Sequence, residues 1–265
     1  MDPIVIKVAA RYKDKKVSEE GNPIYLYSER QVARRNNEKA RRLEDLRGNV
    51  HKLRAQVKKD LKSGDPERVM TALAVGLIDH TAERVGNSSS AEEGHFGVTG
   101  WTKDHISFSK GKATLKYVGK SGVKQNKVVS DKALVSALRD AYEACDDGIF
   151  CQDDFTVDAK KVNSYLKKFD VTAKDLRGLH ANTVMREQLK ALRKGPLPTD
   201  PKERKAQLKD EFKKALEETA KAVGHEPSTL KSQYLVPSME KDFLKDGTVI
   251  DRLSKKVTAR YLGSP

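Results

Sequence analysis

The sequence contains no long hydrophobic run, and this absence excludes several classes of protein. No segment approaches the roughly 18 consecutive apolar residues of a membrane span, and the first residues lack the apolar core of a signal peptide. The two cysteines, Cys145 and Cys151, have no metal-ligand spacing and no wider Cys/His set around them. We therefore expect an intracellular protein with reduced thiols, without membrane association, and without a metal or other cofactor.

Negative charge is the scarcer sign in this chain. Lys and Arg number 52 against 38 Asp and Glu, which leaves a net charge of +14 and a pI of about 9.6. A surplus of this size favours a polyanionic partner, most often nucleic acid. The alternative is a highly charged surface that serves only solubility. Hydrophobic residues make up 37% of the 265 residues, enough for one large domain or one domain with a small appendage.

The first part of the chain is expected to change from strands to helices. Residues 3–8 and 23–27 read as short strands, with a polar loop over 13–22. From Ser28 to about position 61, Leu and Val recur every three or four residues, which predicts a long helix with a basic outer face. Pro66 is expected to open an apolar helix that ends near Arg84. An arginine at such a boundary binds an anion or forms a salt bridge, here with Asp79 or Glu83.

An alternating pattern from Ile106 to Val129 predicts a small antiparallel sheet. Turns are expected at positions 110–111 and 119–122, which places Lys120 at a hairpin tip. Gly119-Lys120-Ser121 also resembles the end of a phosphate-binding P-loop. That motif requires a glycine where Thr114 stands and a helix where a strand follows, so a nucleotide-binding loop is excluded.

Further helices are expected over 131–144, over 158–169, after the N-cap Thr172, from Pro201 to Gly224, and around Val249 to Tyr261. Arg177 follows a helix start, where the positive end of the helix dipole favours a phosphate. No internal repeat is visible. The predicted fold class is α+β and mainly α, with a small antiparallel β-sheet.

One stretch, from 219 to 237, joins two helical segments through a corner. Gly224 is a natural helix end, so His225 is expected at the corner, and Ser228 is a candidate N-cap for the second segment. Tyr234 lies nine positions after His225, so a helix hairpin could bring imidazole and phenol to one site. The alternative is a polar hairpin whose tyrosine belongs to the core.

Five side chains along the sequence form a chemically coherent set: Arg84, Lys120, Arg177, His225 and Tyr234. Phosphodiester transfer needs a nucleophile, stabilisation of two non-bridging oxygens, and a proton for the leaving oxygen. A phenol can serve as the nucleophile, arginines match phosphate oxygens with forked donors, and lysine can act as the acid. A charge clamp of side chains requires no metal.

The sequence resembles the catalytic domain of the type IB topoisomerases, specifically the poxvirus-like and bacterial branch. The similarity extends roughly from Tyr25 to Tyr261. The segments that carry it are Arg84-Val85-Gly86-Asn87 with Phe96-Gly97, Tyr117-Val118-Gly119-Lys120-Ser121-Gly122, Thr172-Ala173-Lys174-Asp175-Leu176-Arg177, and Val223-Gly224-His225-Glu226-Pro227-Ser228 leading to Tyr234.

This resemblance implies a DNA breaking-rejoining enzyme fold and a role for each of the five residues. Tyr234 would attack DNA to form a 3′-phosphotyrosyl bond and a free 5′-hydroxyl. Arg84, Arg177 and His225 would hold the non-bridging oxygens, and Lys120 would protonate the leaving oxygen. The expected activity is relaxation of supercoiled double-stranded DNA by a monomer, without ATP or metal. The candidate DNA-binding residues are Arg34, Arg35, Lys124, Lys174 and Lys231.

The sequence departs from the family in its N-terminal part. Residues 1–28 are too few for the usual N-terminal clamp domain, so we expect a catalytic domain over 29–265 with weaker, salt-sensitive DNA binding. Two alternatives remain. A tyrosine recombinase or integrase uses the same five residue types, but generally has a histidine where Lys174 precedes Arg177. A non-catalytic DNA-binding protein would use only the basic helices.

Overall fold

The computed structural model describes residues 14–17, 23–152 and 155–249. The chain divides into two compact units, residues 1–42 and 43–265. In the first unit, strand β1 (Asp14–Val17) pairs antiparallel with β2 (Pro23–Leu26), with Lys15 opposite Tyr25. The strand predicted over 23–27 is confirmed, whereas the loop predicted over 13–22 is wrong for residues 14–17. A lone strand leaves its backbone groups unpaired, and β1 supplies partners for β2. The strand predicted over 3–8 lies outside the described residues.

Two long helices open the helical part of the chain, as predicted. Helix α1 (Glu29–Asp60) crosses from the first unit into the second, where its Leu and Val side chains between 43 and 57 are buried. Helix α2 (Pro66–Thr81) begins where Asp65 caps it by accepting a hydrogen bond from the Arg68 amide. It ends at Ala82, whose φ of 57° is left-handed, so the helix stops slightly before the predicted boundary at Arg84.

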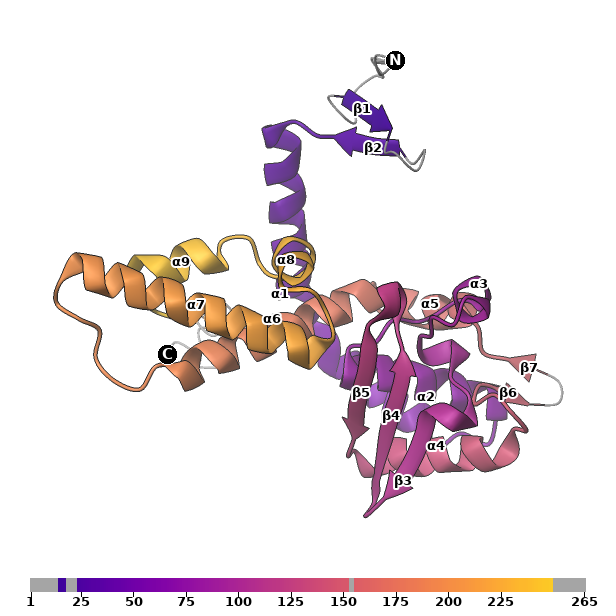
Figure 1. Cartoon of the computed structure of the whole chain (residues 1–265). Coiled ribbons are helices and arrows are strands. Elements are labelled where there is room, and N and C mark those ends of the chain that lie inside the picture. Colours follow the sequence, from indigo (N-terminus) through magenta and orange to yellow (C-terminus); the bar gives the residue numbers. More distant parts are fainter. Residues whose placement is uncertain (1–13, 18–22, 153–154, 250–265) are drawn as a thin grey trace, which may run out of the picture. The chain divides into compact units, whose positions relative to one another are not determined.

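The predicted antiparallel sheet is present in the second unit. It consists of β3 (Ile106–Ser109), β4 (Lys112–Val118) and β5 (Lys124–Val129), in that order. Ala113, Leu115 and Tyr117 alternate with more exposed residues along β4, so one face of the sheet is buried. Helices α2 and α4 (Lys132–Ala144) pack against this sheet (Figure 1). The strand that follows Lys120 agrees with the exclusion of a P-loop.

The remaining elements follow mostly the predicted order. Helices α4, α5, α6 and α7 confirm the predictions, and Thr172 caps α6 through a reciprocal bond with Asp175. The bounds are α3 (Ser88–Glu92), α4 (Lys132–Ala144), β6 (Cys151–Gln152), β7 (Phe155–Thr156), α5 (Ala159–Lys167), α6 (Ala173–Leu192), α7 (Pro201–Val223), α8 (Pro227–Thr229), a π-turn (Leu230–Tyr234) and α9 (Met239–Asp246). Helices α3 and α9 were not predicted. The helix predicted around 249–261 lies almost wholly outside the described residues.

Two hydrophobic cores form the interior of the second unit. The first core joins α1, α2, the sheet, α4, α5 and the start of α6 as far as Leu179. The second core begins at Ala181 and joins the rest of α6 to α7, the π-turn and α9. Helix α6 therefore runs from one core into the other, and α7 packs along it (Figure 1). The predicted mainly helical α+β class is confirmed. Within the part of the chain that the structure describes, every helix is too short or too polar to be a membrane span.

Candidate active site

A pocket of about 90 Å³ lies in the second unit, where the two cores meet. Four of the five predicted catalytic residues line it, and the fifth, Tyr234, stacks against one of them. The sheet, α6 and the ends of α2 and α7 all contribute to its wall. The lining residues are Glu83, Arg84, Lys120, Val123, Gln125, Arg177, Gly224, His225, Glu226 and Thr229.

Arg84 lies in the loop that follows α2 and is half-buried. Its carbonyl accepts a hydrogen bond of 2.9 Å from the Val98 amide. Gly97 permits this approach, because a Cβ at that position would come within 2.5 Å of the Gly86 nitrogen and 2.8 Å of the Arg84 carbonyl oxygen. This contact accounts for the glycine in Phe96-Gly97, thirteen residues after the arginine.

The two carboxylates considered as salt-bridge partners of Arg84 pair with other cations. Asp79 accepts hydrogen bonds of 2.7 and 3.0 Å from the Arg54 guanidinium. Glu83 lies 3.6 Å from the Lys127 ammonium. The guanidinium of Arg84 thus faces a pocket in which the other cations gather.

Lys120 occupies the tip of the hairpin between β4 and β5, as predicted. A tight turn holds the tip, closed by a 2.8 Å hydrogen bond from the Gly119 amide to the Val123 carbonyl. The Lys120 side chain is exposed and reaches the pocket from its open side. Its long flexible stem can follow a ligand that enters there.

Arg177 lies in the second turn of α6 and is only 7% exposed. Its Nη2 donates a short hydrogen bond to Nε2 of His225. Its buried Nε–H has no hydrogen-bond acceptor among the described residues. Burial lowers the pKa of Arg177, and the neighbouring Arg84 charge lowers it further. A buried guanidinium with an unused donor is suited to an anion.

His225 follows the end of α7, where Gly224 has a φ of 70°. The His225 amide donates to the Ala220 carbonyl at 2.9 Å, which fixes the corner. Burial lowers the pKa of His225 to about 3, with smaller contributions from the Arg177, Arg84 and Lys127 charges. The imidazole is therefore neutral at physiological pH. Because Nε2 accepts from Arg177, the ring proton lies on Nδ1.

Tyr234 ends a π-turn, in which the Leu235 amide donates to the Leu230 carbonyl at 3.1 Å. Its ring stacks on that of His225, with centroids 4.7 Å apart and an interplanar angle of 19°. The Arg177 guanidinium carbon lies 5.2 Å from the centre of the Tyr234 ring. The phenol is 6% exposed and lies in the second core. Both interpretations of the stretch 219–237 therefore apply, since Tyr234 is a core residue and is also next to the pocket.

The segment that carries Tyr234 begins two residues earlier than predicted. Its N-cap is Glu226, followed by Pro227 at the first helical position, and not Ser228. Proline has no amide hydrogen and a fixed φ, so it is well suited to the first position of a helix. This geometry places Ser228 inside the first turn.

The sequence analysis did not identify Asn182, which is 2% exposed on α6 and lies beside the site. Its side-chain amide donates to the Tyr234 carbonyl at 2.9 Å, and its oxygen accepts from the Val236 amide at 2.9 Å. Asn182 thus holds the backbone on both sides of Leu235. A polar residue on the buried face of a helix, five positions after Arg177, was the available signal.

The three candidate DNA-binding lysines in the second unit are all exposed. Lys124 begins β5, next to the Lys120 hairpin. Lys174 donates to Gln233 at 3.3 Å, and Lys231 pairs with Glu240 at 2.7 Å. Lys174 and Lys231 thus lie beside the segment that carries Tyr234.

The two candidate arginines lie on α1 within the first unit. Arg34 pairs with Glu38 at 2.8 Å, and the Arg35 guanidinium lies 3.7 Å from the centre of the Tyr27 ring. Both contacts are local to that unit.

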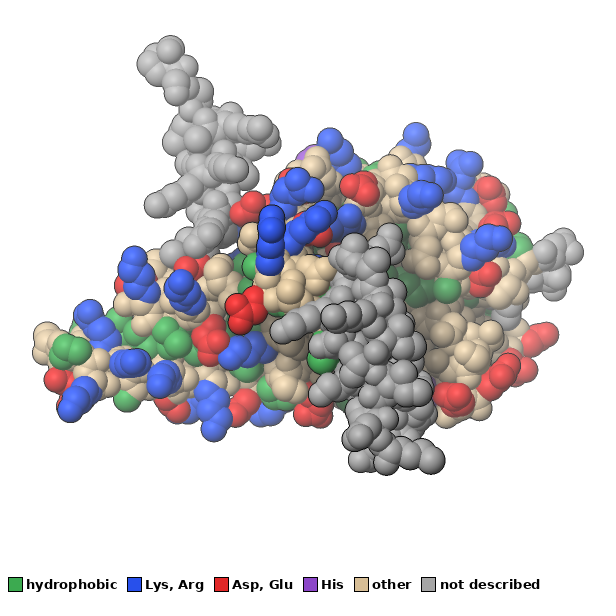
Figure 2. Space-filling view, turned by 90° about the horizontal axis from the view of Figure 1, so that it is seen from above, with side chains coloured by type: hydrophobic (Ala, Val, Ile, Leu, Met, Phe, Trp, Pro, Cys, Tyr) green, Lys and Arg blue, Asp and Glu red, His purple; other side chains and the backbone are tan. Residues whose placement is uncertain are grey.

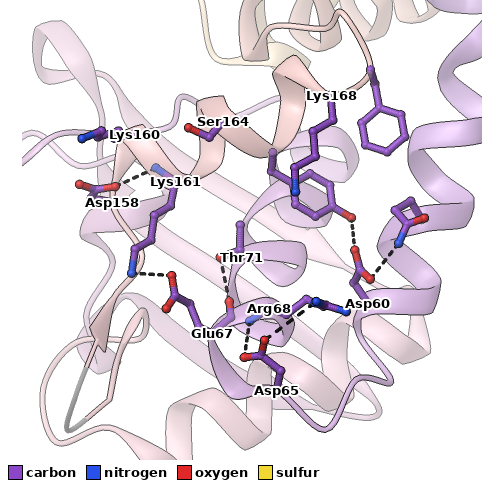
Figure 3. A pocket seen from close by; sticks show the side chains of 13 residues that line it. Asp60, Asp65, Glu67, Arg68, Thr71, Asp158, Lys160, Lys161, Ser164 and Lys168 are labelled. Carbon is purple, nitrogen blue, oxygen red and sulfur yellow. Dashed lines mark hydrogen bonds and ion pairs between the residues drawn. The ribbon is translucent and has the colours of Figure 1, made fainter.

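A larger pocket of about 820 Å³ lies between the end of α1, the start of α2 and α5 (Figure 3). Several of its charged or polar side chains pair with one another. Lys161 and Glu67 are 2.7 Å apart, and Tyr165 donates to Asp60 at 2.8 Å. The small pocket differs because Arg84, Lys120 and Arg177 outnumber its carboxylates. On charge, the small pocket is the better candidate for binding an anion.

Comparison with known proteins identifies the family of the chain. The family model described as "Eukaryotic DNA topoisomerase I, catalytic core" matches residues 28–257. A DNA topoisomerase 1B of Acanthamoeba polyphaga mimivirus is 24% identical over 231 residues, which cover 82% of this chain and 67% of that protein. A crystal structure of the XerH site-specific recombinase, bound to a palindromic difH substrate, aligns with a TM-score of 0.42 and 13% identity. That alignment covers 94% of this chain but only 60% of the length of the recombinase. Because the family model matches most of its length, the chain belongs to the family of eukaryotic DNA topoisomerase I catalytic cores.

Proposed function

We propose that this chain is a type IB topoisomerase catalytic domain, extending over residues 29–265, which cleaves and rejoins DNA. The finer part of the proposal is that it relaxes supercoiled duplex DNA as a monomer, without ATP or metal. The observation that carries the proposal is the shared pocket of Arg84, Lys120, Arg177 and His225, with Tyr234 stacked at its side. Membership of the topoisomerase family supports the same reaction.

The positive charge of the pocket suits a phosphodiester with two non-bridging oxygens. Arg177 offers a buried Nε–H with no acceptor among the described residues, and Arg84 lines the same space. A phosphate oxygen that takes the Nη2–H of Arg177 would release Nε2 of His225. A neutral imidazole with its proton on Nε2 could then donate to the same phosphate. The guanidiniums and the histidine together would stabilise the transition state.

The reaction exchanges one ester bond for another. The Tyr234 oxygen forms a bond to phosphorus and gives its proton to water, while the bond from phosphorus to the 5′-oxygen breaks. Lys120, on its exposed hairpin tip, gives a proton to that leaving oxygen. Attack by the 5′-hydroxyl reverses these steps and rejoins the strand. Because the phosphotyrosyl ester conserves the bond, the cycle requires no external energy source.

The surface charge supports duplex DNA as the substrate. The chain carries a net charge of +14, and many Lys and Arg side chains are spread over the face shown in Figure 2. Lys124 is exposed next to the hairpin tip that carries Lys120, and Lys174 and Lys231 are exposed on the elements that carry Arg177 and Tyr234. Phosphate contacts of this kind give binding that weakens steeply with salt.

The direct test uses supercoiled plasmid in EDTA without ATP. The full chain should produce relaxed topoisomers and a covalent protein–DNA adduct, and Tyr234→Phe should produce neither. Relaxation that depends on magnesium, or that survives the substitution, would refute the proposal. An adduct without relaxation would support cleavage alone and would favour a recombinase.

A further inference from the structure

The residues that line the phosphate pocket belong to elements of two separate hydrophobic cores. Arg84 follows α2 of the first core, whereas His225 follows α7 of the second core. Close packing fixes distances within a core, but it does not by itself fix the distance from Arg84 to His225. Polar contacts across the boundary between the cores can therefore set the distance from Arg84 to His225.

Lys127 makes such a contact from the middle of β5. Its ammonium donates a 2.7 Å hydrogen bond to the carbonyl of Ala222, in the last turn of α7 and 95 positions away. Carbonyls at a helix end have no partner within the helix, and a cation there also interacts favourably with the helix dipole. The Lys127 side chain is 11% exposed, so its charge is held largely away from solvent.

Glu83 supplies the charge that balances this lysine. Its carboxylate lies 3.6 Å from the Lys127 ammonium, and its side chain is 6% exposed. Burial lowers the pKa of Lys127, as does the Arg177 charge, while Glu83 opposes both effects. A buried lysine beside Arg177 would be costly without this carboxylate. Because Glu83 directly precedes Arg84 in the chain, the ion pair is connected through the backbone to Arg84, which lines the pocket.

Gln125 strengthens the same connection from two positions earlier on β5. Residues two apart on a strand share a face, so Gln125 and Lys127 both meet the end of α7. Gln125 packs against Gly224, where an added Cβ would come within 2.2 Å of its side-chain oxygen. Its amide nitrogen lies 3.5 Å from the Gly224 carbonyl oxygen. The strand thus contacts the helix end on both sides of Val223, immediately before His225.

We propose that Lys127 and Glu83 are positioning residues, which tie β5 and Arg84 to the end of α7 and so hold His225 at the correct distance from Arg84. This inference rests on the proposed function for its kinetic consequence. We call this connection between β5, Arg84 and the end of α7 the tie, and it can be tested independently of any reaction. Lys127 does not line the pocket and its side chain is only 11% exposed, so it is not placed to contact the DNA phosphate.

The first measurement follows amide hydrogen exchange in the full chain without DNA. Lys127→Met should speed exchange of the Gly224 and His225 amides, whose hydrogen bonds close the end of α7. Lys127→Arg keeps a cationic donor and should restore protection. Lys112→Met makes the same charge change at the distant end of the sheet and should have no effect there. Unchanged exchange in Lys127→Met would overturn the tie.

The second measurement is the single-turnover rate of covalent adduct formation on plasmid DNA. A small misplacement of a catalytic group is costly, so Lys127→Met should slow the adduct by at least about tenfold. Affinity for DNA should change by less than about threefold, because one buried lysine adds no phosphate contact. An unchanged rate, or a parallel loss of affinity and rate with normal exchange, would contradict a positioning role.

A double substitution keeps the test decisive if Lys127→Met folds poorly. Lys127→Met leaves the Glu83 carboxylate buried without its cation, whereas Glu83→Gln combined with Lys127→Met removes both charges. The double variant should regain stability over the single variant but retain the slow adduct rate. Recovery of the rate would show a purely structural role and overturn the proposal. If the unsubstituted chain formed no adduct, the proposed function would fail, while the exchange experiment would still decide the tie.

Discussion

The ring of His225 stacks on the ring of Tyr234, with 4.7 Å between centroids and 19° between planes. A single guanidinium, that of Arg177, contacts both, since it donates to the His225 ring and lies 5.2 Å from the Tyr234 centroid. The candidate nucleophile Tyr234 and two candidate phosphate-binding residues, Arg177 and His225, therefore form one packed group. Their chemistry can be separated by substitutions that preserve this packing.

Removing the phenolic oxygen should abolish cleavage without loosening the stack. Tyr234→Phe keeps the ring against His225, so we expect stability and DNA affinity to remain near those of the original chain. The covalent adduct, measured by retention of labelled DNA on denatured protein, should disappear. Tyr142→Phe on α4 is the matched control and should keep full activity. Adduct formed by Tyr234→Phe would show that another residue is the nucleophile.

Replacing the planar guanidinium of Arg177 by the ammonium of lysine should slow the chemical step. Arg177→Lys keeps a cation but loses the planar donors, including the buried Nε–H. We expect adduct formation to fall by about a hundredfold, as for the loss of an oxyanion donor, measured under single turnover. Arg68→Lys, in the larger pocket of Figure 3, should leave the rate unchanged. The reverse pattern would move the reactive site to that pocket.

Truncation of Asn182 should affect both stability and cleavage. Asn182→Ala leaves the Tyr234 carbonyl without its side-chain donor and the Val236 amide without its acceptor. The expected loss is about 1–3 kcal/mol in the free energy of unfolding, measured with denaturant. Adduct formation should also slow, because the backbone at Tyr234 is no longer held. Asn126→Ala on the exposed face of β5 should alter stability by less than about 0.5 kcal/mol. Equal effects of the two substitutions would contradict this role.

Mild acid should destabilise the folded chain through His225. Its pKa is about 3 when folded and near 6.5 when unfolded, so between these values the unfolded state binds more protons. Stability should therefore fall as pH decreases from about 6.5 towards 3, and should be unaffected by this group above 6.5. His225→Asn should reduce the pH dependence measured by denaturant unfolding at pH 7 and pH 5. Part of the dependence should persist, because burial also lowers the pKa of His105 and His180. A variant with an unchanged slope would argue against a neutral, half-buried imidazole.

Elements with local signals could be predicted from the sequence. Asp65 followed by Pro66, the Thr172 capping box and the left-handed Gly224 each mark a helix end within a few residues. The alternation along β4 was likewise sufficient for the sheet. In these places the local preference and the tertiary structure agree.

Elements that depend on distant partners could not be predicted. Helix α9 forms because Phe243 is buried against Phe212 of α7, a contact between residues 31 positions apart (243 − 212). In the site, the motifs identified the cations that line the pocket. They could not identify Glu83 and Lys127 as a pair, because nothing in either local sequence indicates the other.

The π-turn before Tyr234 makes the number of residues between the histidine and the tyrosine critical. Each residue of a helix turns the next side chain by about 100°, so deleting one residue at Ser232 would rotate the phenol out of the stack with His225. The extra residue of the wide turn thus sets the direction of the phenol. Substitutions at the exposed position 232 should be tolerated, but a change in loop length there should not be.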